Sequence, residues 1–342
     1  MERGNGAGPV SQTGPREALE GVLYEIKRVI VGQDAMLERL LVALLTGGHV
    51  LLEGVPGLAK TLTVKTLSEV VGGSFKRVQF TPDLVPADLV GTRIYRPDSG
   101  RFDVELGPVL CNFLLADEIN RAPAKVQSAL LEVMQEDQVT IAGHSYPVPQ
   151  PFLVLATQNP IESEGTYPLP EAQTDRFLMK LLVDYPTPGE EAAVVGRSLE
   201  PAPDVARRAE AAELLAFRGD VASVYVDREV IAYAVSLADA TRKPAEWGLG
   251  ELAGYIEYGV SPRGPIGLVQ AARALALLRG RTHAVLSDVR DLAPDVLRHR
   301  LVLSYEALSD GVSADQVLEQ VLDAVEPDMT AEAPVDREEL VA

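Results

Sequence analysis

A glycine-bearing turn that ends in Lys60-Thr61 constrains this chain more than any other stretch of its sequence. The turn follows the short, mainly apolar run 49–53 and opens into residues 62–67, which can form a helix. A strand, a glycine turn, Lys-Thr and a helix in this order are the context that a phosphate-binding loop requires. The residues of the turn are Gly54, Val55, Pro56, Gly57, Leu58, Ala59, Lys60 and Thr61.

The needs of a triphosphate explain these residue types. Glycines let backbone N–H groups approach the phosphate oxygens, and the following helix adds free N–H groups and a positive dipole end. Lys60 would neutralise the β- and γ-phosphates, and the Thr61 hydroxyl would ligate Mg²⁺. Ala59 departs from the general G-x-x-x-x-G-K-[ST] pattern, which has glycine at that position. The alternative is a glycine turn that merely happens to end in Lys-Thr.

The composition is that of a globular protein with an acidic surface. The chain has 342 residues, of which 46% are hydrophobic, which suggests two domains, or one domain and a lid, with a sizeable core. Lys and Arg number 31 against 50 Asp and Glu, and the resulting charge of −19 disfavours a nucleic-acid-binding protein. Cys111 stands alone in an apolar run, so we expect a buried residue and no disulfide. Without a signal peptide or an apolar run of bilayer length, the sequence favours a cytoplasmic protein that does not insert into membranes.

The pattern along the chain predicts an α/β core followed by a helical domain. Residues 1–14 lack periodicity and are expected to be disordered. Residues 15–186 alternate helical patterns with short apolar strands, which predicts a largely parallel sheet. Residues 187–325 are helical in pattern, with no strand signal of comparable strength, and residues 326–342 form an acidic tail.

Two segments of the core, residues 91–102 and residues 139–148, have the pattern of β-hairpins. The first contains Tyr95 and Phe102, and the second contains His144 and Tyr146. These side chains are either packing residues or contacts that face a pore, and the sequence leaves both alternatives open.

Asp117 and Glu118 follow the apolar residues 113–116. A buried strand there would deliver both acids at its carboxyl end, beside the phosphate-binding loop, which also follows a strand. Asp117 would hold Mg²⁺ through water, and Glu118 would orient and activate the attacking water. Many strands simply end in acids at the solvent, but the position downstream of the loop favours function. The four histidines show no ligand spacing, so no metal beyond Mg²⁺ is assigned.

Four more side chains are candidates for the same reaction. Asn159 follows the next strand and could position the attacking water, although Asn-Pro turns are common. Arg176 precedes the last strand of the sheet and would act in trans on a neighbour's nucleotide; otherwise it pairs with Asp175 or lies on the surface. Arg263 opens a helix of the second domain, from which it could reach the phosphates. Arg121 could reach a neighbouring site or be an ordinary charge at a helix start.

In this order the motifs resemble those of the AAA+ ATPases and, within them, of the MoxR family. The resemblance runs from about Val31 to about Leu303, which is most of the chain, and in this family alanine is normal at position 59. The stretches that carry the resemblance are Gly54–Thr61, Ala116–Pro123, Ala156–Pro160, Leu169–Phe177 and Ser261–Arg263.

The resemblance implies a fold and a set of residue roles. The fold is an AAA+ P-loop core with a parallel five-stranded sheet, followed by a small all-α lid domain. Segments 91–102 and 139–148 correspond to the helix-2 insert and to the hairpin before sensor 1. The implied roles are Walker A for Lys60 and Thr61, Walker B for Asp117 and Glu118, sensor 1 for Asn159, arginine finger for Arg176, sensor 2 for Arg263, and proximity to adenine for Val31 and Gly32.

The resemblance also implies a function, which is ATP hydrolysis with Mg²⁺ in hexameric rings that bind nucleotide between subunits. The family is thought to act as chaperones on protein clients, often with a partner that bears a von Willebrand factor A domain, in complex assembly or metal-cofactor insertion. The alternatives are a chelatase motor subunit, a nucleic-acid motor, or a nucleotide-switched scaffold with little turnover. Intact Glu118, Asn159 and Arg176 weigh against the scaffold.

Overall fold

The computed structural model divides into two compact units, the first formed by residues 1–224 and 273–282 and the second by residues 225–272 and 283–342. The structure describes residues 14–55, 57–98, 100–159, 165–201 and 203–325. The acidic tail 326–342 and, apart from Gly14, the N-terminal segment expected to be disordered lie outside the described residues. The units divide after Val224, further along the chain than the boundary expected at residue 187.

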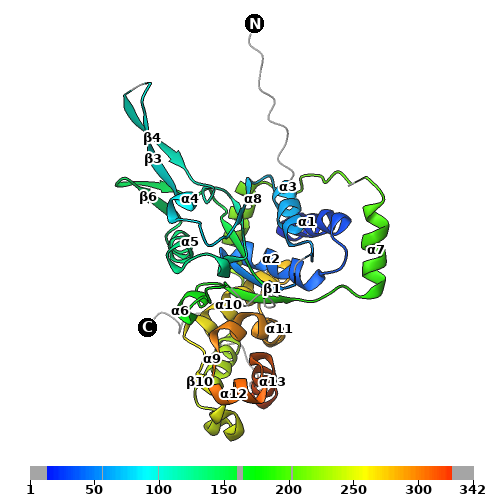
Figure 1. Ribbon diagram of the computed structural model, residues 1–342. Coiled ribbons are helices and arrows are strands. Elements are labelled where there is room, and N and C mark those ends of the chain that lie inside the picture. Colours follow the sequence, from blue (N-terminus) through cyan, green and yellow to red (C-terminus); the bar gives the residue numbers. More distant parts are fainter. Residues whose placement is uncertain (1–13, 56, 99, 160–164, 202, 326–342) are drawn as a thin grey trace, which may run out of the picture. The chain divides into compact units, whose positions relative to one another are not determined.

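A parallel five-stranded sheet forms the centre of the first unit, as predicted (Figure 1). Its order is β2-β5-β8-β1-β9. The two central strands β5 and β8 are buried over almost their whole length, which explains their nearly continuous apolar sequences. The strands are β1 (Val50–Gly54), β2 (Phe75–Gln79), β5 (Phe113–Asp117), β8 (Leu153–Gln158) and β9 (Met179–Val183).

The register of the sheet aligns the carboxyl ends of its strands. Gln79 at the end of β2 pairs with Asp117 at the end of β5, and Glu53 of β1 pairs with Gln158 at the end of β8. The residues that follow these strands therefore meet at one edge, where ligands bind in open parallel sheets.

The first unit contains helices in addition to the sheet, and it continues past the boundary expected at residue 187. Its later helix α8 packs against α2, where the Arg218 guanidinium donates to the Leu44 carbonyl oxygen at 3.2 Å. This packing explains why the unit extends to Val224. The helices of this unit are α1 (Pro15–Val29), α2 (Asp34–Thr46), α3 (Lys60–Val70), α4 (Pro86–Val90), the 3₁₀ helix η1 (Ile119–Arg121), α5 (Ala124–Glu136), α6 (Glu171–Thr174), α7 (Pro188–Ser198) and α8 (Ala211–Ser223).

Cys111 and His49 are both buried in the core of the first unit. Cys111 is buried and free, and its burial raises the pKa of the thiol to about 12, as expected for a packing residue. His49 is also buried; its Nδ1 accepts the Val154 N–H at 3.1 Å, and its Nε2 lies 3.1 Å from the Met134 carbonyl oxygen. The imidazole thus links the start of β1 to β8 and to the last turns of α5.

Both predicted hairpins are confirmed. Strands β3 (Gly91–Arg96) and β4 (Arg101–Leu106) form one antiparallel pair, and β6 (Gln138–Ile141) and β7 (His144–Pro147) form the other. Tyr95 and Phe102 face each other across the first hairpin with ring centroids 5.1 Å apart, and both are about half exposed. Tyr146 of the second hairpin packs against the hydrophobic core, so it is a packing residue.

The second unit is mainly helical, and α9, α11 and α13 pack on one another. A short antiparallel ribbon of β10 (Ile256–Tyr258) and β11 (Val302–Leu303) adds to the expected helices, because strands this short leave no periodic signal. Its helices are α9 (Arg228–Arg242), η2 (Pro244–Trp247), η3 (Gly250–Gly254), the first part of α10 (Arg263–Leu278), α11 (Leu286–Leu297), η4 (Arg298–Arg300), α12 (Tyr305–Asp310) and α13 (Ala314–Ala324). Across the described part of the chain, no helix combines the length and apolarity needed to cross a membrane.

Candidate active site

A cavity of about 420 Å³ opens at the carboxyl edge of the sheet in the first unit. It unites four stretches that are far apart in the sequence: the loop after β1, two residues of β2, the acids at the end of β5 and the polar residues at the end of β8. Its lining residues are Gly54, Gly57, Leu58, Ala59, Lys60, Thr61, Leu62, Arg77, Gln79, Asp117, Glu118, Thr157, Gln158 and Asn159.

The glycines of the loop serve two different purposes. A Cβ added to Gly54 would lie 2.5 Å from the Val183 carbonyl oxygen, so the neighbouring strand β9 excludes any side chain there. Gly57 has open space around it but a φ of 91°, which favours glycine through backbone conformation. Ala59 also adopts a left-handed conformation, with φ 55° and ψ 17°, directly before α3 begins at Lys60. The loop therefore holds an alanine in a geometry that usually belongs to glycine.

Lys60 is half-buried in the cavity, and its Nζ donates to the Gly54 carbonyl oxygen at 2.6 Å. Burial lowers the pKa of the Lys60 ammonium group, and the carboxylates of Asp117, Glu118 and Glu53 counteract this effect. The ammonium group thus lies between the loop and the two acids, where the phosphates of a nucleotide would require a positive charge.

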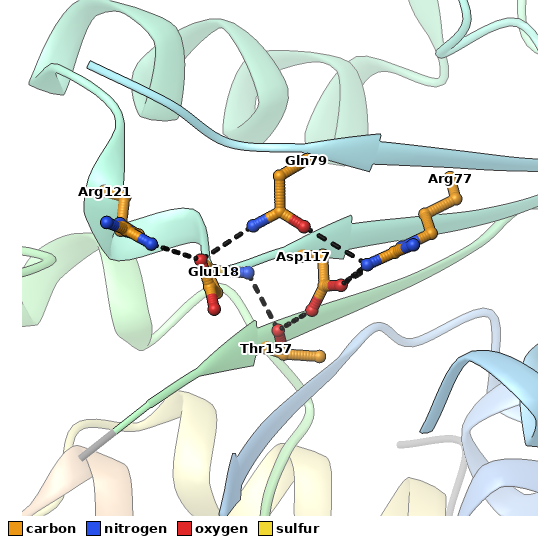
Figure 2. A network of polar contacts seen from close by, with 6 residues as sticks. All are labelled: Arg77, Gln79, Asp117, Glu118, Arg121 and Thr157. Atoms are coloured by element: carbon orange, nitrogen blue, oxygen red, sulfur yellow. Dashed lines mark hydrogen bonds and ion pairs between the residues drawn. The ribbon is translucent and has the colours of Figure 1, made fainter. Parts of the chain in front are cut away.

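Asp117 is held by donors on both carboxylate oxygens (Figure 2). Its Oδ2 accepts from Arg77 Nη2 at 2.6 Å and from Arg77 Nε at 3.1 Å, and its Oδ1 accepts from the Thr157 hydroxyl at 2.7 Å. Such charge-assisted bonds orient a carboxylate firmly. Asp117 therefore points into the cavity from a defined position.

Glu118 has φ 55°, a left-handed conformation that costs a non-glycine residue of the order of 1–3 kcal/mol. Its backbone N–H donates to Thr157 Oγ1 at 2.8 Å, and its Oε2 accepts from Gln79 Nε2 at 2.7 Å and Arg121 Nη1 at 3.0 Å. Figure 2 shows this carboxylate between the two donors, one from β2 and one from η1. The surroundings thus hold the glutamate in one orientation despite its backbone strain.

Three residues of this network, Arg77, Gln79 and Thr157, were not predicted from the sequence. Arg77 and Gln79 alternate along β2, so their side chains share one face of the sheet, and the pairing of β2 with β5 brings that face beside the acids. Thr157 is buried at the end of β8. The only sequence signal for this network is the pair of polar residues at alternate positions of the segment 75–80. This pattern does not indicate which residues they contact.

The donors of the cavity suit Mg²⁺. The Thr61 hydroxyl and the Asp117 carboxylate line the same space and offer the hard oxygen ligands that Mg²⁺ prefers. Among the described residues, no group of three or more His, Cys, Asp or Glu could hold a metal by itself. A metal here would therefore complete its shell with phosphate oxygens and water, which is how Mg²⁺ commonly binds beside a nucleotide.

Several residues predicted from the sequence lie outside this cavity. Val55, Val31 and Gly32 do not line it, and a Cβ at Gly32 would collide with the Glu190 carboxylate instead. Pro56 lies outside the described residues.

The two arginines expected from the resemblance belong to different units of the chain. Arg176 is exposed just beyond α6 and is not among the lining residues. Arg263 is the exposed first residue of α10, in the second unit.

Comparisons with known proteins agree with this architecture. Residues 49–179 match the ATPase family associated with various cellular activities (AAA), and residues 252–321 match the AAA lid domain. Chaperone MoxR1 of Mycobacterium tuberculosis is 55% identical over 307 residues, which cover 90% of this chain and 81% of that protein. The uncharacterized protein YeaC of Bacillus subtilis is 43% identical over 308 residues, covering 88% of this chain and 92% of that protein. A solved structure of a Cytophaga hutchinsonii protein has a TM-score of 0.86 at 48% identity and covers 91% of this chain and 95% of its own.

Proposed function

Because the chain belongs to the MoxR family of AAA+ ATPases, we propose that it hydrolyses Mg²⁺-bound ATP and uses the energy to remodel or mature a protein client. The observation that carries this proposal is the single cavity that unites Lys60, Thr61, Asp117, Glu118 and Asn159. A phosphate-binding loop without the acids would support binding alone. The acids and the amide supply what hydrolysis needs in addition.

Each side chain has a defined task in the proposed reaction. The loop N–H groups and Lys60 bind the β- and γ-phosphates, and Thr61 and Asp117 hold Mg²⁺, which neutralises developing charge on the phosphates. Glu118 accepts the proton of the attacking water, and Asn159 orients that water without adding charge. Gln79 and Arg121 both donate to Glu118 Oε2, so Oε1 is the carboxylate oxygen that accepts this proton.

The second part of the proposal concerns the assembly. Arg176 acts in trans, as an arginine finger that a neighbouring subunit inserts beside the γ-phosphate in a hexameric ring. Its exposure and its absence from the cavity of its own chain support this role. Arg263 contacts the phosphates from the helical lid, so that nucleotide binding moves the lid domain.

The client and the cellular setting complete the proposal. A relative that is named a chaperone supports a protein client. The family resemblance adds that the client is handled in complex assembly or metal-cofactor insertion, with a partner that bears a von Willebrand factor A domain. The site of action is the cytoplasm. A nucleic-acid substrate is disfavoured by the net charge of −19.

Steady-state hydrolysis by the full chain tests the central claim. We expect Mg²⁺-dependent ATP turnover in the wild type and none in Glu118→Gln, which retains ATP binding because the loop is intact. Undiminished turnover in Glu118→Gln would remove this residue from the mechanism. The same variant, locked with ATP, should capture the client in a pull-down, and the matched Lys60→Ala protein, which cannot bind ATP, should not.

A further inference from the structure

Arg77 occupies one of the two oxygens of the Asp117 carboxylate. Its two hydrogen bonds to the acid, from Nη2 and from Nε, end on the same oxygen, Oδ2. The other oxygen, Oδ1, accepts the Thr157 hydroxyl. A carboxylate has about four lone-pair positions. Three of them are therefore occupied by protein donors, and the guanidinium is the strongest of these because it carries a full charge.

We propose that Arg77 is an internal counter-ion that occupies Asp117 and is displaced when Mg²⁺ arrives with the nucleotide. This inference rests on the proposed function, in which Asp117 helps to hold the metal. Oδ2 already accepts two bonds from the guanidinium, so Arg77 competes for this oxygen with a water ligand of Mg²⁺, and the two cations also repel each other. The affinity of the site for the metal is then lower than the oxygen ligands alone would give.

The position of Arg77 in the sheet allows it to leave. Strand β2 is at the edge of the sheet, and the Arg77 side chain is 49% exposed, whereas Asp117 is only 19% exposed. The half-exposed guanidinium borders solvent, so it can turn into water and be hydrated there when a competing cation arrives. The acid, by contrast, stays in place through Thr157, which donates to it from within the core.

The displacement of Arg77 would also reach the catalytic glutamate. Arg77 Nη2 donates to Gln79 Oε1 at 3.2 Å, and Gln79 Nε2 donates to Glu118 Oε2 at 2.7 Å (Figure 2). The guanidinium thereby fixes the amide orientation that presents the Nε2 group to Glu118. When Arg77 leaves, the amide loses this restraint, so its hydrogen bond to Glu118 is less firmly held while the bond from Arg121 remains. Metal loading thus changes the surroundings of Glu118 through two side chains of β2.

Binding of a fluorescent, non-hydrolysable analogue, methylanthraniloyl-labelled AMP-PNP, to the full chain with Mg²⁺ and with EDTA tests this inference. In Arg77→Gln the bare Asp117 repels the metal-free analogue, so its affinity in EDTA falls. With Mg²⁺ the competitor is gone, so the affinity holds or rises. We expect the ratio of the two affinities to increase by about threefold to tenfold over the wild type. Arg77→Lys keeps the positive charge but lacks the forked guanidinium, so its affinity ratio should lie between those of the wild type and Arg77→Gln.

Lys76→Gln is the matched control, because it removes the same charge from the same strand on the opposite face. Its affinity ratio should equal that of the wild type. An equal loss of affinity with and without Mg²⁺ in Arg77→Gln would overturn the inference, since it would mean that Arg77 contacts phosphate or supports the fold. An unchanged ratio would overturn it as well. A wild-type chain that binds the analogue under neither condition would overturn the proposed function and this inference together.

Discussion

The hydroxyl of Thr157 donates to Asp117 Oδ1 at 2.7 Å and at the same time accepts the backbone N–H of Glu118 at 2.8 Å. One buried side chain of β8 therefore fixes both the proposed metal ligand and the backbone of the proposed catalytic base. Asp117 is the last residue of β5, and Glu118 follows it. The Thr157 hydroxyl therefore also joins β5 to the neighbouring strand β8 at the point where chemistry is expected.

Replacement of Thr157 by valine should reduce ATP turnover by about tenfold or more, because a lost buried hydrogen bond costs about 1–3 kcal/mol and leaves Asp117 free to rotate. Valine keeps the shape and β-branching of threonine, so nucleotide binding in EDTA should change little. Turnover and analogue affinity are measured side by side. Thr157→Ser restores the hydroxyl and should recover most of the activity, and similar losses in both variants would argue against this role.

The sequence alone was sufficient to predict the loop, Asp117, Glu118 and Asn159 as one site. Each of these groups follows an apolar strand, and the carboxyl ends of parallel strands meet at one edge. A largely parallel sheet and both hairpins were predictable from apolar runs, alternation and turn residues, which are local signals, whereas the number of five strands came from the family resemblance.

The remaining parts of the site depend on pairing that local patterns do not encode. Arg77 and Gln79 reach the acids only because β2 lies beside β5 in register, with Gln79 opposite Asp117. Gly54 was interpreted as room for phosphate, whereas its nearest constraint is the Val183 carbonyl oxygen of β9. Strand order therefore decides what these residues contact, and one sequence does not give it.

Gly54→Ala should destabilise the fold by about 1–3 kcal/mol, because its Cβ would force the backbone of β9 to move. Ala59→Gly removes a strained left-handed alanine and should leave stability nearly unchanged, since relief of strain offsets the greater freedom of the unfolded chain. Thermal denaturation followed by circular dichroism compares both with the wild type. A Gly54→Ala protein as stable as the wild type would contradict this prediction, because it would mean that the backbone of β9 moves at little cost in free energy.

His49 should make folding sensitive to acid. Burial lowers the pKa of its imidazole from 6.5 to about 4, so the unfolded chain binds a proton at a pH where the folded chain does not. The stabilisation that the neutral imidazole provides is present above about pH 6.5 and is lost as the pH falls towards 4. The free energy of unfolding should therefore fall by about 2 kcal/mol between pH 7 and pH 5. Urea unfolding at the two pH values measures this. His49→Gln has no titrating group at this position, so its free energy of unfolding should fall correspondingly less between the two pH values. An equal fall in the variant and the wild type would exclude His49 as the cause.

Mixing of two inactive variants tests whether the site is shared between subunits. Arg176→Ala lacks the proposed finger, and Lys60→Ala lacks nucleotide binding, so each should hydrolyse almost no ATP alone. In a random equal mixture, a site has an intact Lys60 with probability one half and a neighbour with an intact Arg176 with probability one half, so activity should return to about one quarter of wild type. The double variant mixed with either single variant creates no complete site and is the control. Failure of the two single variants to complement would place Arg176 outside the neighbour's reaction.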